Sequence, residues 1–248
     1  MTKAGKPSPV RDIRFFAGSG YTYVSGCHEA TAFGRRVAFL LRSRGYSFGS
    51  WHHLYIRAVE RDRADTPVVA LEGAEWWHRF VEVTVPPGFA AMDESERTQL
   101  LIARAKSVLK SLLPKNDSGL EEILAKAERE RDRLRFLVKR KNIGGRSVEV
   151  SFNVAVWPHS SDLLVTVKDL SADGNMVSPP IKLKIYDDAF SLAGDVRQEG
   201  ETIRIVPRKS FTAQLVAAQY EASLAIPLSA FSPLSCLPPT SHLIEGPT

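Results

Sequence analysis

The sequence predicts an α+β protein, and three observations carry that prediction. Residues 28–44 have apolar side chains at the three- and four-residue spacing of a helix with one buried face, and short β-like runs lie before and after them. Residues 93–141 contain two longer stretches of helical spacing. Residues 148–156 alternate apolar and polar side chains, which is the period of a half-buried strand.

The first region, residues 1–90, is predicted to begin with strands, continue as a helix and end in strands. Residues 13–17 and 21–25 are β-like runs around a glycine-containing turn, and Gly45 is a stop signal after the helix. This β-α-β-β order is typical of a helix lying across a mostly antiparallel sheet, so we expect a ferredoxin-like arrangement. The further strands are predicted at 51–59, 68–72 and 79–85.

The middle region, residues 91–143, is predicted to be an inserted basic helical hairpin. Asp93 is a suitable N-cap for a helix that runs to Leu113, and the polar residues 114–119 form the turn to a second helix. Residues 144–248 are then predicted to be an antiparallel β region with a Pro- and Ser-rich tail from Pro227. Its strands are expected at 148–156, 163–168, 181–185, 202–206 and 211–216.

The positive charge of the chain is concentrated in one segment, Lys126–Lys141. This segment holds eight basic and three acidic residues, so its net charge of +5 equals the net charge of the whole chain. The remaining residues cancel, and the pI near 9.2 therefore has a local origin. A local basic excess favours an anionic partner such as a nucleic acid.

On a helical projection of this segment, four basic residues share the face opposite the apolar one, and an aromatic residue lies beside them. A stripe of one sign is typical of a helix that faces a polyanion, and RNA is the partner that we expect. The alternative is a solvated helix face whose charges form intrahelical ion pairs, and the sequence leaves both open. The predicted RNA-binding residues are Lys126, Arg129, Arg133, Phe136 and Arg140.

Candidate catalytic residues cluster around the start of the first helix. His28 can exchange a proton near neutral pH, and Arg35 or Arg36 can stabilise negative charge on a phosphorus-centred transition state. Together with Tyr23 these groups suffice for metal-free RNA cleavage, in which the 2′-hydroxyl attacks the adjacent phosphate. The alternative is that His28 only caps or packs against the helix start.

A strand leading into a helix with an early histidine, followed by an arginine-rich helix, resembles the CRISPR repeat-processing endoribonucleases. The resemblance implies a metal-independent endoribonuclease, with Tyr23, His28 and Arg35 or Arg36 near the cleavage site. It also implies that Lys126, Arg129, Arg133 and Arg140 face the stem of a bound RNA hairpin, with further subunits of a ribonucleoprotein complex as possible partners. No cofactor and no metal are implied.

Several other classes of function are disfavoured. The chain has no Walker loop, no nucleophile elbow, no HExxH motif and no dinucleotide fingerprint, and its two cysteines are too few for a cysteine-rich zinc site. No run of apolar residues is long enough for a membrane span, and the sparse cysteines fit a reducing cytoplasm. The alternative to RNA binding is a non-enzymatic protein-interaction module, such as a toxin-immunity protein, for which Trp51, Trp76 and Trp77 are candidate contact residues.

Overall fold

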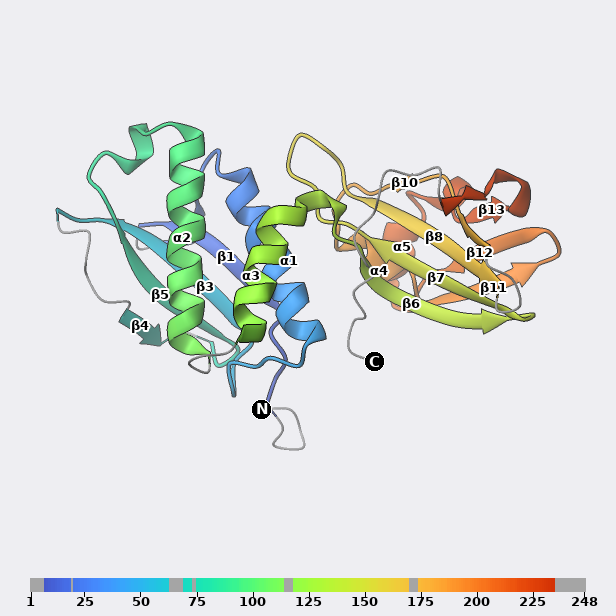
Figure 1. Cartoon of the computed structure of the whole chain (residues 1–248), viewed down its shortest axis with the longest axis horizontal. Coiled ribbons are helices and arrows are strands. Elements are labelled where there is room, and N and C mark those ends of the chain that lie inside the picture. The colour runs from blue at the N-terminus through green and yellow to red at the C-terminus, as the bar shows by residue number, and fades with distance from the viewer. Residues whose placement is uncertain are drawn as a thin grey trace. The chain divides into compact units, whose positions relative to one another are not determined.

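A computed structural model describes residues 7–18, 20–62, 69–72, 75–113, 118–169 and 174–234 (Figure 1). The chain forms two compact units, Met1–Arg131 and Asp132–Gly246. Both contain helices and sheets, so the α+β class is confirmed. The boundary between the units lies within residues 91–143, which the sequence analysis had treated as one separate region.

The first unit is built on a five-stranded sheet with the order β2-β1-β3-β5-β4. Strand β1 pairs in parallel with β3, and β3 pairs in parallel with β5, while the two edge strands are antiparallel to their neighbours. Helix α1 (His28–Ser43) makes the crossover from β1 to β3. The strands are β1 (Asp12–Ala17), β2 (Thr22–Tyr23), β3 (His53–Glu60), β4 (Val69–Glu72) and β5 (His78–Val85).

This parallel core differs from the expected sheet. The sequence analysis predicted a mostly antiparallel sheet, and the ferredoxin-like arrangement is not confirmed, because the three central strands run in the same direction. The strand positions themselves were predicted well. Strand direction was missed because it depends on which strands become neighbours, and the hairpin of β4 and β5 inserts β5 beside β3.

Three helices cover one face of this sheet (Figure 1). Helix α1 packs on β1, with α2 (Glu94–Leu112) and α3 (Ser118–Glu130) against it. The helix α2 begins as predicted at Asp93, whose carboxylate accepts a hydrogen bond of 2.8 Å from the backbone amide of Ser95. Helix α1 approaches β1 so closely at Gly34 that an added Cβ would lie 2.7 Å from the carbonyl oxygen of Ile13.

The basic segment is not one helix, which corrects the sequence prediction. Helix α3 ends at Glu130, a 3-10 turn η2 covers Arg131–Arg133, and the chain continues as the edge strand β6 (Phe136–Ile143). Arg131 has a positive φ of 48°, where an α-helix cannot continue. The apolar side chains of Leu134 and Phe136 are buried two residues apart, so the strand period prevails over the helical one.

The second unit contains two sheets. The larger sheet has the order β14-β9-β8-β7-β6, with β10 also paired to β8, and the smaller one has the order β11-β12-β13. All of these strand pairs are antiparallel, as predicted for this region. The strands are β7 (Arg146–Phe152), β8 (Asp162–Asp169), β9 (Asn175–Val177), β10 (Ile181–Lys182), β11 (Asp195–Glu199), β12 (Thr202–Val206), β13 (Ala225–Pro227) and β14 (Ser232–Pro233).

The predicted strand at 211–216 is instead a helix. Helix α5 (Phe211–Ala217) begins after Ser210, whose hydroxyl accepts a hydrogen bond of 3.3 Å from the amide of Ala213. The other short helical elements are η1 (Phe89–Ala91), α4 (Asp188–Leu192), η3 (Glu221–Ser223) and η4 (Leu228–Ala230).

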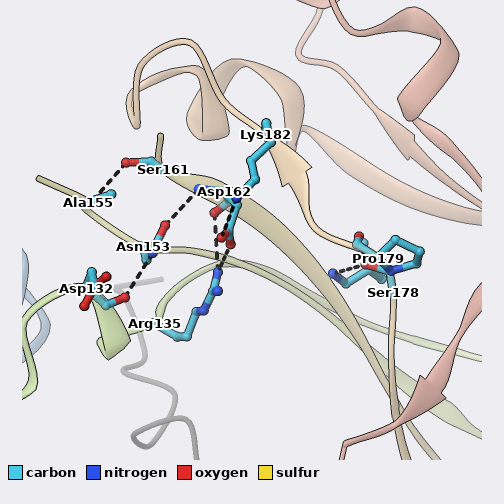
Figure 2. A network of polar contacts seen from close by, with 10 residues as sticks. Asp132, Arg135, Asn153, Ala155, Ser161, Asp162, Ser178, Pro179 and Lys182 are labelled. Atoms are coloured by element: carbon cyan, nitrogen blue, oxygen red, sulfur yellow. Dashed lines mark hydrogen bonds and ion pairs between the residues drawn. The ribbon is translucent and has the colours of Figure 1, made fainter. Parts of the chain in front are cut away.

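A polar network fixes the loop between β7 and β8 (Figure 2). The side chain of Asn153 accepts a hydrogen bond of 2.8 Å from the amide of Asp162 and donates one of 3.0 Å to the carbonyl of Asp132. Arg135 binds the Asp162 carboxylate and its carbonyl. Because these groups satisfy one another at a buried position, we assign them to the stability of the unit.

Candidate nucleic-acid interface

The two faces of the first sheet carry different side chains. Ile13 and Phe15 meet Gly34 of α1, so their face is the one covered by helices. Side chains one residue away along each strand point to the opposite face. The strand register groups ten residues there that we call the aromatic face, beside Val59 and Thr84 at its far end: Asp12, Arg14, Phe16, Tyr23, His53, Tyr55, Arg57, His78, Phe80 and Glu82.

The centre of the aromatic face is a cluster of buried aromatic rings. Phe16, Tyr55 and Phe80 form one cluster, with ring centroids of 5.1 Å from Phe16 to Tyr55 and 5.4 Å from Tyr55 to Phe80. Two tyrosines extend it to the surface. The ring of Tyr23 stacks on Phe16 at 5.0 Å, and the ring of Tyr21 meets Phe80 edge-on at 5.2 Å. Tyr21 and Tyr23 remain 58% and 52% exposed, so each presents ring surface to solvent.

Two arginines lie among these rings. The guanidinium of Arg57 is 3.6 Å from the ring centroid of Phe80, within cation–π range. Arg14 is 5.8 Å from the ring centroid of Tyr55, and its Nη1 donates a hydrogen bond of 2.8 Å to the hydroxyl of Tyr23. Glu82, opposite Arg57 in the register, pairs with Arg61 at 2.9 Å. The face thus combines stacking surface with two guanidinium groups, and aromatic rings with basic groups are what single-stranded nucleic acids bind.

Asp12 pairs with two arginines, Arg14 of the same strand and Arg35 of α1. Its buried carboxylate pairs with Arg14 at 2.5 Å through one oxygen and with Arg35 of α1 through the other. One negative charge stands against two positive charges, which leaves a net charge of +1. The structure therefore brings two predicted site residues, Tyr23 and Arg35, into one network through two residues that were not predicted, Asp12 and Arg14.

Arg36 and His28 are the other two predicted catalytic residues. Arg36 is completely buried and pairs with Glu29, which lies about two turns earlier in α1. A guanidinium without solvent access does not contact a substrate. We therefore assign Arg36 to the stability of the first unit and not to the candidate site. His28 is the first residue of α1, and its side chain is exposed.

His53 and His78 occupy the end of the aromatic face where β3 and β5 begin, and the ring of His52 lies 4.5 Å from that of His53. The pKa of His53 is lowered to about 3. Burial is the largest cause, and the adjacent His52 and nearby arginines contribute to the same shift. Burial also lowers the pKa of His52 and of His78. The side chain of His78 is 3.4 Å from the hydroxyl of Tyr21. His53 is thus a neutral imidazole near pH 7, able to donate and accept hydrogen bonds without adding charge.

The predicted RNA-binding residues do not form one stripe. Lys126 and Arg129 lie on α3 in the first unit, whereas Arg133 and Arg140 belong to the second. Phe136, expected beside the basic face, is a buried core residue with 3% exposure.

Some of the basic residues of the segment Lys126–Lys141 form ion pairs with acidic side chains. The carboxylate of Glu149, itself 2% exposed, is 2.9 Å from Nε of Arg140 and 2.9 Å from Nζ of Lys168. Within α3, Arg129 pairs with Glu130 at 3.2 Å, and Glu121 pairs with Lys110 of α2 at 2.7 Å. Paired charges contribute less to attracting a polyanion, because their fields cancel at a distance.

Among the residues that the structure describes, no three acidic, histidine or cysteine side chains converge in a way that would hold a metal ion. None of the helices within the same residues has the length and apolar content needed to cross a membrane.

Comparison with known proteins gave no match to the chain among protein-family models, curated proteins or solved structures.

The sequence analysis did not predict the aromatic face, because it considered the charge pattern of helices. It did not consider which residues of neighbouring strands share a face of the sheet. The signal was present: Arg14 and Phe16 are two residues apart, as are Tyr55 and Arg57, and His78 and Phe80. Aromatic and arginine side chains at alternate positions of three neighbouring strands gather on one face.

Proposed function

We propose that this protein binds single-stranded RNA across the aromatic face of its first unit. One observation carries the proposal: Tyr21 and Tyr23 expose ring surface above a pile of buried rings, with Arg14 and Arg57 among them. Unstacked bases of RNA stack on aromatic rings and on arginine planes, and a basic surround neutralises the phosphates.

The same observation favours a single-stranded segment over a duplex. The exposed rings of Tyr21 and Tyr23 need unstacked bases, which a continuous duplex does not offer, and the major groove of an A-form stem is too narrow for side chains to read. A hairpin remains a suitable ligand in this proposal, because the bases of its loop are unstacked. Lys126 and Arg129, which the sequence analysis assigned to a stem, lie on α3 at the helix-covered side of the sheet. In this proposal they contact phosphates only where the RNA extends beyond the aromatic face.

The test compares two sets of substitutions in the full chain. In the first, Tyr21→Ala and Tyr23→Ala remove both exposed rings. In the second, Arg129→Glu and Arg133→Glu reverse two basic residues; Arg140 is left unchanged because it neutralises the buried carboxylate of Glu149. Binding is followed by fluorescence anisotropy with a labelled single-stranded RNA, a hairpin RNA and a blunt duplex.

The proposal expects the tyrosine variant to lose affinity for the single strand and the hairpin, with the charge-reversal variant weakened less. Loss confined to the charge-reversal variant would favour the basic segment as the interface. Absence of RNA binding by the unmodified protein, even at low salt, would contradict both, and the search would turn to a protein partner of the toxin-immunity kind.

Cleavage of the bound RNA is a second proposal, and it rests on His28, Tyr23 and Arg35. The exposed imidazole of His28 supplies a proton-transfer group. The network that joins Tyr23 to Arg35 through Arg14 and Asp12 supplies a phenol and a guanidinium. His28→Ala is expected to retain RNA binding and to abolish metal-independent cleavage, measured by gel analysis of products in the presence of a chelator. Undiminished cleavage would remove His28 from the mechanism.

A further inference from the structure

A hollow of about 450 Å³ opens in the second unit, beside the end of β12 and helix α5. Ile205 and Leu224 give it an apolar lining, and both are buried. Arg204, Arg208 and Lys209 also line it. The volume lies within the range of small-molecule sites, which typically combine apolar walls with a few polar groups that orient the ligand.

The three cations differ in what they bind. Arg204 is engaged with Glu199, whose carboxylate oxygen is 2.8 Å from its Nε. Arg208 and Lys209 form no ion pair with any residue in the described part of the chain, and both are exposed. Glu221 is the acidic residue in the lining. Two unpaired positive charges against one negative charge leave the hollow with a net attraction for anions.

The backbone that presents Arg208 is held in place. Its amide donates a hydrogen bond of 2.9 Å to the carbonyl of Ser191. Gly194 packs against the same peptide so closely that an added Cβ would lie 2.6 Å from the Arg208 nitrogen. A cationic side chain on an anchored backbone loses less freedom when it binds a ligand than one on a loose loop does.

We propose that this hollow binds a small organic phosphate monoester with an apolar body. The phosphate lies at Arg208 and Lys209, and the body lies against Ile205 and Leu224. A phosphate monoester carries a charge of about −1.5 to −2 at neutral pH, which suits the two unpaired cations. Arginine binds phosphate through two parallel hydrogen bonds, and lysine adds a point charge. This site uses other residues than the proposed RNA interface and stands independently of it.

In the experiment, the full-length protein is titrated with phenyl phosphate, and binding is measured by calorimetry and by NMR. Inorganic phosphate and phenol are titrated in parallel, since each carries half of the proposed ligand chemistry. The expected result is that phenyl phosphate binds more tightly than either. Arg208→Ala combined with Lys209→Ala should weaken it about tenfold or more, because both charge-assisted contacts are lost.

Two single substitutions sharpen this test. Glu221→Gln should strengthen binding of phenyl phosphate, because it removes the one negative charge of the lining. Arg197→Ala, on an exposed arginine of β11 that is not in the lining, should leave it unchanged. The proposal is overturned if phenyl phosphate shows no saturable binding at millimolar concentrations, if phenol or inorganic phosphate binds equally well, or if the folded double variant binds like the unmodified protein.

Discussion

Tyr23 offers the sharpest perturbation of the proposed RNA interface. Its ring stacks on Phe16, and the residue is 52% exposed. Removing an aromatic side chain on which one base stacks typically costs about 1–3 kcal/mol of binding free energy. Tyr23→Ala should therefore raise the Kd for single-stranded RNA by about 5-fold to about 150-fold.

A second substitution separates stacking from hydrogen bonding. Tyr23→Phe keeps the ring and removes only the hydroxyl that accepts from Arg14. Because this bond is exposed to solvent, its loss should change the Kd by a factor of about three at most. Phe211→Ala is the matched control, since Phe211 is an aromatic residue of the second unit with 75% exposure and no place in the aromatic face.

The assay is fluorescence anisotropy at fixed ionic strength, because affinity for RNA depends steeply on salt. Circular dichroism and a urea titration establish that each variant is folded. If Tyr23→Ala is folded and binds RNA like the unmodified protein, or if Phe211→Ala loses as much affinity, stacking on the aromatic face is refuted.

Three further predictions concern stability. Gly34→Ala should destabilise the protein by about 1–3 kcal/mol in urea unfolding, because its new Cβ overlaps the Ile13 carbonyl; an unchanged midpoint would contradict the close packing of α1. Stability should fall as the pH drops from 6.5 towards 3, because His53 has a pKa of about 3 in the folded state and resists the proton that the unfolded chain accepts. His53→Gln should flatten that decline, measured by urea titrations across the range, and an identical slope would remove His53 as its cause. Burial, followed by its bond to Asp188, raises the pKa of Tyr220 to about 12, so stability should fall between pH 10 and 12. Tyr220→Phe should lose that slope, and a slope retained in the variant would assign it to other groups.

The sequence predicted local structure well where one period is unambiguous. The helix at residues 28–44 and the strand at 202–206 match α1 and β12 closely, because the apolar spacing and the stop signals agree there. The segment 126–141 failed because Leu134, Leu137 and Val138 fit a helix, whereas Leu134, Phe136 and Val138 fit a strand equally well. Pairing with β7 decides between them, and pairing is not a local property.

The site was only half predictable for a similar reason. Tyr23 and Arg35 were selected for their chemistry near the first helix, and both lie in the network around Asp12. The rest of the aromatic face comes from strands far apart in sequence, and only the order of β1, β3 and β5 brings it together. Arg36 was selected with its neighbour, but one step along a helix turns a side chain by about 100°, which takes Arg36 into the core.

The most direct test of RNA binding at the aromatic face is to locate the RNA itself. A single-stranded RNA crosslinked to the full-length protein by ultraviolet light, followed by mass spectrometry of the peptides, maps the contact residue by residue. RNA bound at the aromatic face should crosslink to Tyr21 and Tyr23, which carry the exposed rings. Crosslinks confined to peptides of α3 and β6, with none in residues 20–25, would place the RNA on the basic segment and contradict it.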